Sequence, residues 1–171
     1  MTATVEAAFG SSRWASGFLL NNELTDFSRN PEINGKLVAN APASEKRPRS
    51  SMSPTMVFDR ENKLRMVTGS PGGNSIPAYV AKTIIAVLDW GLSAQQAVDY
   101  PNIIARGDKV RVEVATPQGQ AIADDLNARG YTVQERAGEN SGLHVIVNLL
   151  DRSYFDHFTE VNAEEEVQAI L

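Results

Sequence analysis

Short apolar runs bounded by polar turns indicate a series of β-strands along this chain. Residues 55–58 and 64–67 form two such runs, and the polar turn 59–62 between them predicts a hairpin. Residues 2–9 alternate polar and apolar side chains, which is typical of a half-buried strand. The same reasoning predicts further strands at residues 18–20, at 110–114, from Tyr131 onward and at 143–150.

Three other segments carry helical signals. Apolar residues recur at helical spacing across residues 76–88, and a glycine shortly after them supplies a C-terminal stop. Residues 93–96 match a capping box that opens a short helix, which Pro101 ends. The Thr-Pro pair at 116–117 supplies an N-cap and a first helical residue for a third helix, which extends to Arg129.

The order of these elements predicts an α+β fold in which helices pack on an antiparallel sheet, in place of an alternating βαβ fold. Residues 21–26 are polar and suited to the rim of a pocket, and residues 27–49 show no periodicity, so we expect residues 27–49 to form a long loop. Long loops inside compact domains usually bind or cover a ligand. Residues 151–171 are acidic and have only a weak helical pattern, so we interpret them as a divergent tail.

Composition indicates a globular chain that neither crosses a membrane nor binds nucleic acid. At 171 residues with 42% apolar side chains, the chain can bury a substantial core. No apolar run approaches the roughly 20 residues of a membrane-spanning helix, and the first residues lack the pattern of a signal peptide. The net charge of −5 and the scattered lysines and arginines argue against a nucleic-acid partner. We therefore expect a soluble protein, and these features leave its compartment open.

The residue inventory also argues against several kinds of reactive centre. The chain has no cysteine, so it has no disulfide, no thiolate nucleophile and no cysteine-ligated metal. His144 and His157 are the only histidines, and two imidazoles on different elements make a poor zinc site and a poor Ser–His pair. We therefore expect no metal and no cofactor.

A glycine-rich segment, GSPGG at residues 69–73, lies between a predicted strand and a predicted helix. Backbone N–H groups at such a position can bind an anion. A nucleotide-phosphate loop would need a Lys-Ser/Thr pair or a GxGxxG pattern, and neither is present. Two interpretations remain from these residues alone: a tight turn that needs positive φ, and an oxyanion hole made of consecutive backbone donors.

Three segments in the same order closely resemble the small subunit of γ-glutamyltranspeptidases. They are GFLLNNELTDFS at residues 17–28, KRPRSSMSPT at 46–55 and TGSPGG at 68–73. The resemblance covers residues 1–150, which we interpret as a small-subunit-like domain followed by the tail 151–171. It implies part of a layered αββα sandwich of the N-terminal-nucleophile hydrolase class.

The resemblance also implies a mechanism and a set of site residues. In this family an N-terminal threonine, exposed when the precursor cleaves itself, attacks the γ-glutamyl carbonyl while its own α-amine acts as base. The matching residues take four roles: Gly72 and Gly73 as the oxyanion hole, Glu23 and Asp26 as partners of the substrate's α-ammonium, Ser50 and Ser51 as partners of its α-carboxylate, and Thr4 as support for the nucleophile. Without the resemblance, the two acids would be interpreted as solvated loop residues and the two serines as turn formers.

The family's nucleophile is expected upstream of the strand at residues 2–9, so we expect this chain to lack it; Thr2 lies inside that strand and is not assigned the role. Two hypotheses follow. The chain is the C-terminal portion of a γ-glutamyl transferase/hydrolase acting on glutathione-like compounds and inactive alone, or it is a non-catalytic binding or assembly module derived from that family. A larger subunit of the same precursor, or a second copy, is the expected protein partner, and members of the family are often periplasmic or extracellular.

Overall fold

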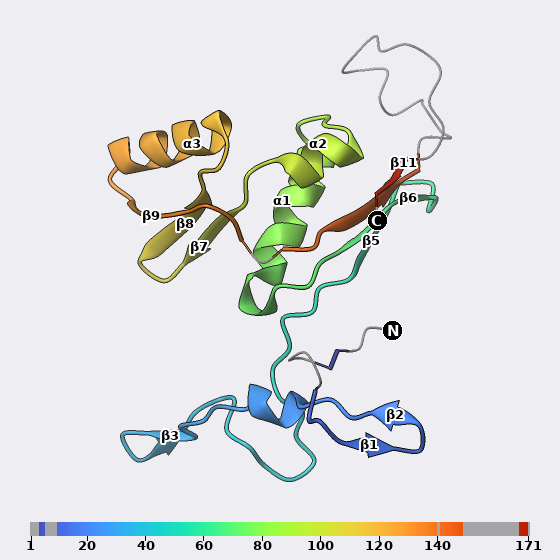
Figure 1. Cartoon of the computed structure of the whole chain (residues 1–171), viewed down its shortest axis with the longest axis vertical. Helices are drawn as coiled ribbons and strands as arrows, with labels where there is room; N and C mark the ends of the chain where they lie inside the picture. Colours follow the sequence, from blue (N-terminus) through green and yellow to red (C-terminus); the bar gives the residue numbers. More distant parts are fainter. Residues whose placement is uncertain (1–3, 6–9, 140, 149–167, 171) are drawn as a thin grey trace. The chain divides into compact units, whose positions relative to one another are not determined.

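The computed structural model describes residues 4–5, 10–139 and 141–148 together with the backbone of residues 168–170. The chain separates into two compact units, Met1–Ser50 and Ser51–Leu171. Figure 1 shows the elements of both units. Among the helices of the described residues, none has the length and apolar composition that crossing a membrane requires.

The first unit is built from two small hairpins and one short helix. Strand β1 (Trp14–Ala15) pairs antiparallel with β2 (Phe18–Leu19), and β3 (Glu32–Ile33) pairs antiparallel with β4 (Lys36–Leu37). A 3-10 helix, η1 (Glu23–Asp26), lies between the hairpins in the sequence.

The turn that joins β3 to β4 has a clear local cause. Asn34 and Gly35 have φ values of 51° and 72°, and an Asn-Gly pair is the preferred two-residue turn for such a hairpin. The prediction of an unstructured loop over residues 27–49 is therefore wrong in part, because the hairpin of β3 and β4 lies inside it.

The second unit is organised around an antiparallel four-stranded sheet with the order β11-β10-β6-β5. Its strands are β5 (Thr55–Phe58), β6 (Leu64–Gly69), β10 (His144–Val147) and β11 (Gln168–Ile170). The predicted hairpin is confirmed, with Asp59 accepting hydrogen bonds from the backbone N–H groups of Glu61 and Lys63 in its turn. The strand predicted at 143–150 is confirmed over 144–147.

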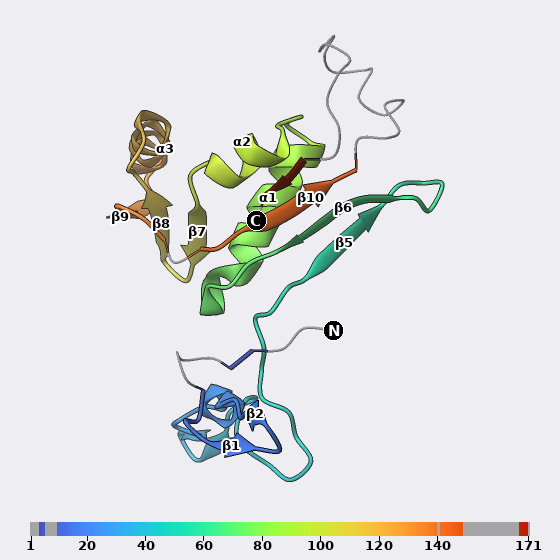
Figure 2. The same cartoon turned by 45° about the vertical axis from the view of Figure 1, so that its right-hand side comes forward.

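Two helices cover one face of this sheet. Helix α1 (Ile76–Leu88) lies across the strands, and α2 (Ala94–Asp99) follows it, as Figure 2 shows. Their apolar side chains form one core with the inward side chains of β6 and β10: Met66, Ala86, Val87, Ala94, Ala97, Val145 and Val147. The capping box predicted for α2 is present, because the Ser93 side chain accepts from the N–H of Gln96 and the Gln96 side chain accepts from the N–H of Ser93.

A second, three-stranded sheet completes this unit. It has the order β7 (Ile103–Arg106), β8 (Lys109–Glu113) and β9 (Thr132–Arg136), and α3 (Pro117–Ala128) connects β8 to β9. The N-cap is Thr116, as predicted, and its side chain accepts from the N–H of Gly119.

The α+β class is confirmed, but two details of the prediction are wrong. Strands β8 and β9 are parallel, so β8, α3 and β9 form a βαβ unit where only antiparallel pairing had been predicted. Strand β7 had not been predicted. Its sequence, IIAR, is a short apolar run that was not recognised as a strand, and its last two residues, Ala105 and Arg106, are exposed.

The two ends of the chain bear less on the predictions. Most of the strand predicted at 2–9 lies outside the described residues, and Thr4 and Val5, which are described, belong to no strand. Residues 168–170 fall within the weak helical pattern of the tail but form β11, antiparallel to β10. The rest of the segment 151–171 lies outside the described residues.

Candidate functional site

The glycine turn, residues 69–73, connects the end of β6 to the start of helical structure. Gly72 has a φ of 131° and Gly73 a φ of 57°, and both values favour glycine. A 3-10 helix, η2 (Gly73–Ser75), follows directly and leads into α1. The prediction that this turn needs positive φ is confirmed.

The N–H groups of Gly72 and Gly73 are available to a ligand. Neither donates to an acceptor in the part of the chain that the structure describes. Gly73 is exposed, and a Cβ built on it would meet no atom within 4 Å. Two successive backbone donors without an acceptor among the described residues are a suitable arrangement for an anion or a developing oxyanion.

Ser51 lies beside this turn. Its Oγ is 3.5 Å from Oδ1 of Asn74, the residue that follows Gly73. The backbone carbonyl of Ser51 accepts a hydrogen bond from the Ser53 hydroxyl at 3.0 Å, which orders the segment before β5. Within the second unit, the structure therefore brings one predicted carboxylate partner to the predicted oxyanion turn. Ser50 is exposed and is the last residue of the first unit.

The two predicted ammonium partners lie on η1 in the first unit. Glu23 and Asp26 are its first and last residues, and both are half-buried. The Asn21 side chain accepts from the N–H of Glu23, and the Asn40 side-chain amide donates to the carbonyl of Asp26 at 2.6 Å. The short helix therefore holds two carboxylates three positions apart on one turn of backbone.

The remaining candidates are less informative. Thr4 is half-buried and in no strand, and its role in supporting a nucleophile stays a prediction. His144 is exposed on β10, and its Nδ1 lies 2.7 Å from the carbonyl oxygen of Gly142. His157 lies outside the described residues. Among the described residues, no group of three or more His, Cys, Asp or Glu side chains is placed to hold a metal ion.

A buried polar network lies directly behind the glycine turn, and sequence reasoning missed it. Arg111 on β8 donates to the hydroxyl of Ser75 at 2.5 Å and forms an ion pair with Glu139 at 3.4 Å. The Tyr79 hydroxyl donates to the same Glu139 oxygen at 2.9 Å. Burial, reinforced by this hydrogen bond, raises the pKa of Tyr79 to about 12, so the phenol stays a donor at neutral pH. The members lie far apart in the sequence, and no local pattern connects them.

A buried lysine forms a second unpredicted feature. Lys82 on α1 is 7% exposed, and its ammonium donates to the carbonyls of Ala97 at 2.7 Å and Tyr100 at 2.9 Å. These carbonyls lie at the C-terminal end of α2, where helical carbonyls lack backbone partners. Burial lowers the pKa of Lys82 to about 8, although the charges of Glu113 and Asp99 oppose the shift. This lysine is therefore a structural cap for α2.

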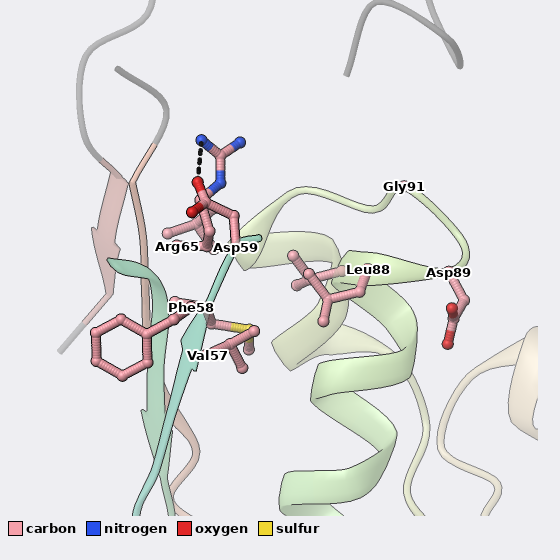
Figure 3. Close-up of a pocket in the computed structure, with 10 residues that line it drawn as sticks. Val57, Phe58, Asp59, Arg65, Leu88, Asp89 and Gly91 are labelled. Atoms are coloured by element: carbon pink, nitrogen blue, oxygen red, sulfur yellow. Dashed lines mark ion pairs between the residues drawn. The ribbon is translucent and has the colours of Figure 1, made fainter. Parts of the chain in front are cut away.

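A cavity of about 320 Å³ opens at the other end of β6 and α1, away from the glycine turn. Figure 3 shows its lining, which is mainly apolar and includes Val57, Phe58 and Leu88. One ion pair, between Arg65 and Asp59 at 4.0 Å, borders it. None of the predicted site residues lines this cavity, so we do not assign it to the candidate site.

Comparison with known proteins gives one consistent result. A family model described as gamma-glutamyltranspeptidase matches residues 1–167. The glutathione hydrolase proenzyme of Escherichia coli is 40% identical over 122 residues, covering 66% of this chain and 21% of that protein. The glutathione hydrolase proenzyme of a Pseudomonas species is 39% identical over 161 residues, covering 88% of this chain and 27% of that protein.

Solved structures are similar as well. The crystal structure of an acivicin-inhibited gamma-glutamyltranspeptidase superposes with a TM-score of 0.72 and 35% sequence identity. That match covers 90% of this chain and 85% of the solved chain. The two curated relatives are much longer, and this chain spans only about a fifth to a quarter of their length.

Proposed function

Because the chain belongs to the gamma-glutamyltranspeptidase family, we propose that it is the C-terminal portion of an enzyme that cleaves the γ-glutamyl amide of glutathione-like compounds. The γ-glutamyl group is transferred to water or to an amino acid. The observation that carries this proposal is the glycine turn, where two consecutive N–H groups lack acceptors among the described residues beside open space. That arrangement suits acyl transfer, in which a carbonyl oxygen gains negative charge.

The proposed reaction assigns a separate step to each group. The hydroxyl of an upstream N-terminal threonine adds to the γ-glutamyl carbonyl carbon, and its proton passes to that threonine's own α-amine. The carbonyl oxygen becomes an oxyanion and accepts from the N–H groups of Gly72 and Gly73. Collapse then breaks the amide C–N bond, and the amine leaves with the proton. Water or an acceptor amine attacks the resulting ester, which releases the γ-glutamyl product and restores the threonine.

The substrate-binding roles are part of the same proposal. Ser51, beside the turn through its contact with Asn74, and Ser50 bind the substrate's α-carboxylate. Glu23 and Asp26 bind its α-ammonium, because a carboxylate pair suits a cation that loses water on binding. Thr4 supports the nucleophile.

The layered sandwich and the larger partner are also proposed, on the basis of the face of the four-stranded sheet that no helix of the described residues covers. Met56, Val67 and Ile146 form one cross-strand row on β5, β6 and β10, opposite the face that α1 and α2 cover. Met56 is 64% exposed and Ile146 is 45% exposed. Apolar rows of this kind usually mark an interface, and a second sheet stacked on it would complete an αββα arrangement.

The test compares this chain alone with a protein that also carries the upstream segment and its threonine. We expect release of the chromophore from a γ-glutamyl anilide only in the second case, because the turn can stabilise an oxyanion only after a nucleophile has attacked. Turnover by the chain alone that survives both Thr2→Ala and Thr4→Ala would contradict the assignment of the nucleophile. No turnover in the longer protein, despite a folded state, would favour a non-catalytic binding module.

A further inference from the structure

Two sets of contacts hold the glycine turn, one on each side. On the side of α1, the N–H of Ser75 donates to the carbonyl of Gly72 at 3.2 Å, so the position of Ser75 determines the position of the turn. Ser75 is 7% exposed, and its hydroxyl accepts from Arg111 at 2.5 Å. This serine is therefore the link between the turn and the buried network behind it.

On the side of β6, the connection between β9 and β10 contacts the turn. This connection contains both Glu139, which pairs with Arg111, and Gly142. The N–H of Gly142 donates to the Ser70 hydroxyl at 3.3 Å. A Cβ at Gly142 would come within 2.8 Å of the Pro71 ring, so this backbone packs directly on the turn. The segment that contains Glu139 and Gly142 therefore contacts the glycine turn from both sides, through Arg111 on one side and directly on the other.

We propose that Arg111 is a positioning residue for the oxyanion hole: its guanidinium ties Ser75 to Glu139 and thereby holds the N–H groups of Gly72 and Gly73 in place for catalysis. The inference rests on the proposed function of the turn. It adds to the site a residue from the three-stranded sheet, 38 positions after Gly73 in the sequence.

The network is built to keep the guanidinium in one position. The Glu139 side chain is 7% exposed, and the hydroxyl of Tyr79, which is 1% exposed, donates to the oxygen that faces Arg111. The N–H of Glu139 itself donates to Glu113 at 2.6 Å, which anchors the backbone of the segment to β8. A planar guanidinium can donate to a hydroxyl and a carboxylate at once in a fixed geometry. A lysine ammonium is a point charge on a flexible stem and fixes that geometry less well.

The test uses the complete precursor that carries the threonine, with wild-type turnover of a γ-glutamyl anilide as the reference. We expect Arg111→Met to lower kcat by about 10- to 100-fold at equal folded concentration, because small misplacements of catalytic groups have effects of that order. KM should change less than about twofold, because Arg111 is not among the residues assigned to bind the substrate.

Two further variants separate a positioning effect from a loss of folding. Arg111→Met leaves the buried Glu139 carboxylate without its cation, so the double variant Arg111→Met/Glu139→Gln removes both charges, and we expect it to show the same loss of kcat. Arg65→Met is the control, because Arg65 is likewise paired with an acid, but at the far end of β6; its side chain is 10% exposed, against 32% for Arg111. Its kcat per folded molecule should equal the wild-type value.

A mutant cycle identifies the route of the effect. Ser75→Ala should lower kcat to a similar extent, and Arg111→Met/Ser75→Ala should lower it no further, because both residues act through one contact. Additive losses, an unchanged kcat in Arg111→Met, or a change confined to KM would each overturn the inference. Absence of turnover in the wild-type precursor would instead contradict the proposed function.

Discussion

Gly72 and Gly73 adopt backbone conformations that a side chain disfavours, so both the shape of the turn and its chemistry depend on the same two residues. A substitution there changes stability through backbone strain and changes activity only if the N–H groups take part in the reaction. A second glycine with the same conformation, located elsewhere in the chain, separates these two effects. Gly107, in the turn between β7 and β8, has a φ of 66° and, like Gly73, open space at its Cβ position.

We expect Gly73→Ala and Gly107→Ala to lose similar stability, about 1 kcal/mol each, because both force alanine into a left-handed conformation. Only Gly73→Ala should lower kcat, by on the order of 10²-fold, because relaxation of the strained backbone turns the donor away from the oxyanion. Denaturant unfolding and turnover at equal folded concentration in the complete precursor measure the two effects. Equal kcat in both variants would show that the turn has only a structural role.

The proposed binding of the substrate's α-ammonium by η1 also depends on single residues. We expect Asp26→Asn in the complete precursor to lower kcat/KM by roughly 10- to 100-fold, the effect of losing one hydrogen bond to a charged group. The backbone of the loop should stay in place, because Asn40 binds the carbonyl of Asp26 and not its side chain. Glu32→Gln is the control, since Glu32 is an exposed acid on β3 of the same unit. Indistinguishable kcat/KM values for the two variants would make Asp26 an ordinary loop acid.

At the scale of elements, the packing of α1 and α2 depends on one buried charge. Lys82 caps the end of α2 from α1, and burial keeps the pKa of its ammonium near 8, below the ordinary value of 10.5. Below pH 8 the lysine is charged in both states, so the cost of burying that charge is fully present. As the pH rises from 8 toward 10.5, the unfolded chain binds more protons than the folded one, and the cost disappears.

Wild-type stability should therefore rise with pH relative to a Lys82→Met variant, which does not titrate. We expect the difference in the free energy of unfolding to move by roughly 1–2 kcal/mol in favour of the wild type between pH 7 and pH 9.5. Ionisation of Tyr79 does not affect this difference, because both proteins contain Tyr79 and its contribution cancels. Urea unfolding of both proteins at the two pH values measures the effect. A difference that stays constant with pH would contradict the lowered pKa.

At the scale of the whole molecule, the apolar row of Met56, Val67 and Ile146 lies on the face of the four-stranded sheet that no helix of the described residues covers. We expect the isolated chain to self-associate through this face, and Met56→Lys/Ile146→Lys to reduce that association by placing charges on it. Stability should change by no more than about 0.5 kcal/mol per substitution, since these side chains are largely exposed.

Sedimentation velocity at matched concentrations measures the association. The control is Ile33→Lys, which changes an equally exposed apolar residue in the other unit. Association that is unaffected by the double substitution would exclude this face as the interface.

Local signals in the sequence determined those elements whose cause lies within a few residues. The hairpin of β5 and β6, the stripe of α1, the capping box at Ser93 and the N-cap at Thr116 were all predicted, because turn chemistry, helical periodicity and caps operate over three to eight positions. The glycine turn was predicted for the same reason, since the ability to adopt positive φ is a property of glycine itself.

Only the tertiary structure decided which distant segments meet. The parallel pairing of β8 with β9, the strand β7 and the network from Arg111 through Ser75, Glu139 and Tyr79 depend on contacts between residues tens of positions apart. Such contacts follow from burial and from the pairing of polar groups inside the fold, and neighbouring residues in the sequence contain no record of them. The motifs therefore determined the conformation of the turn, while the packing of distant segments decided which residues contact it.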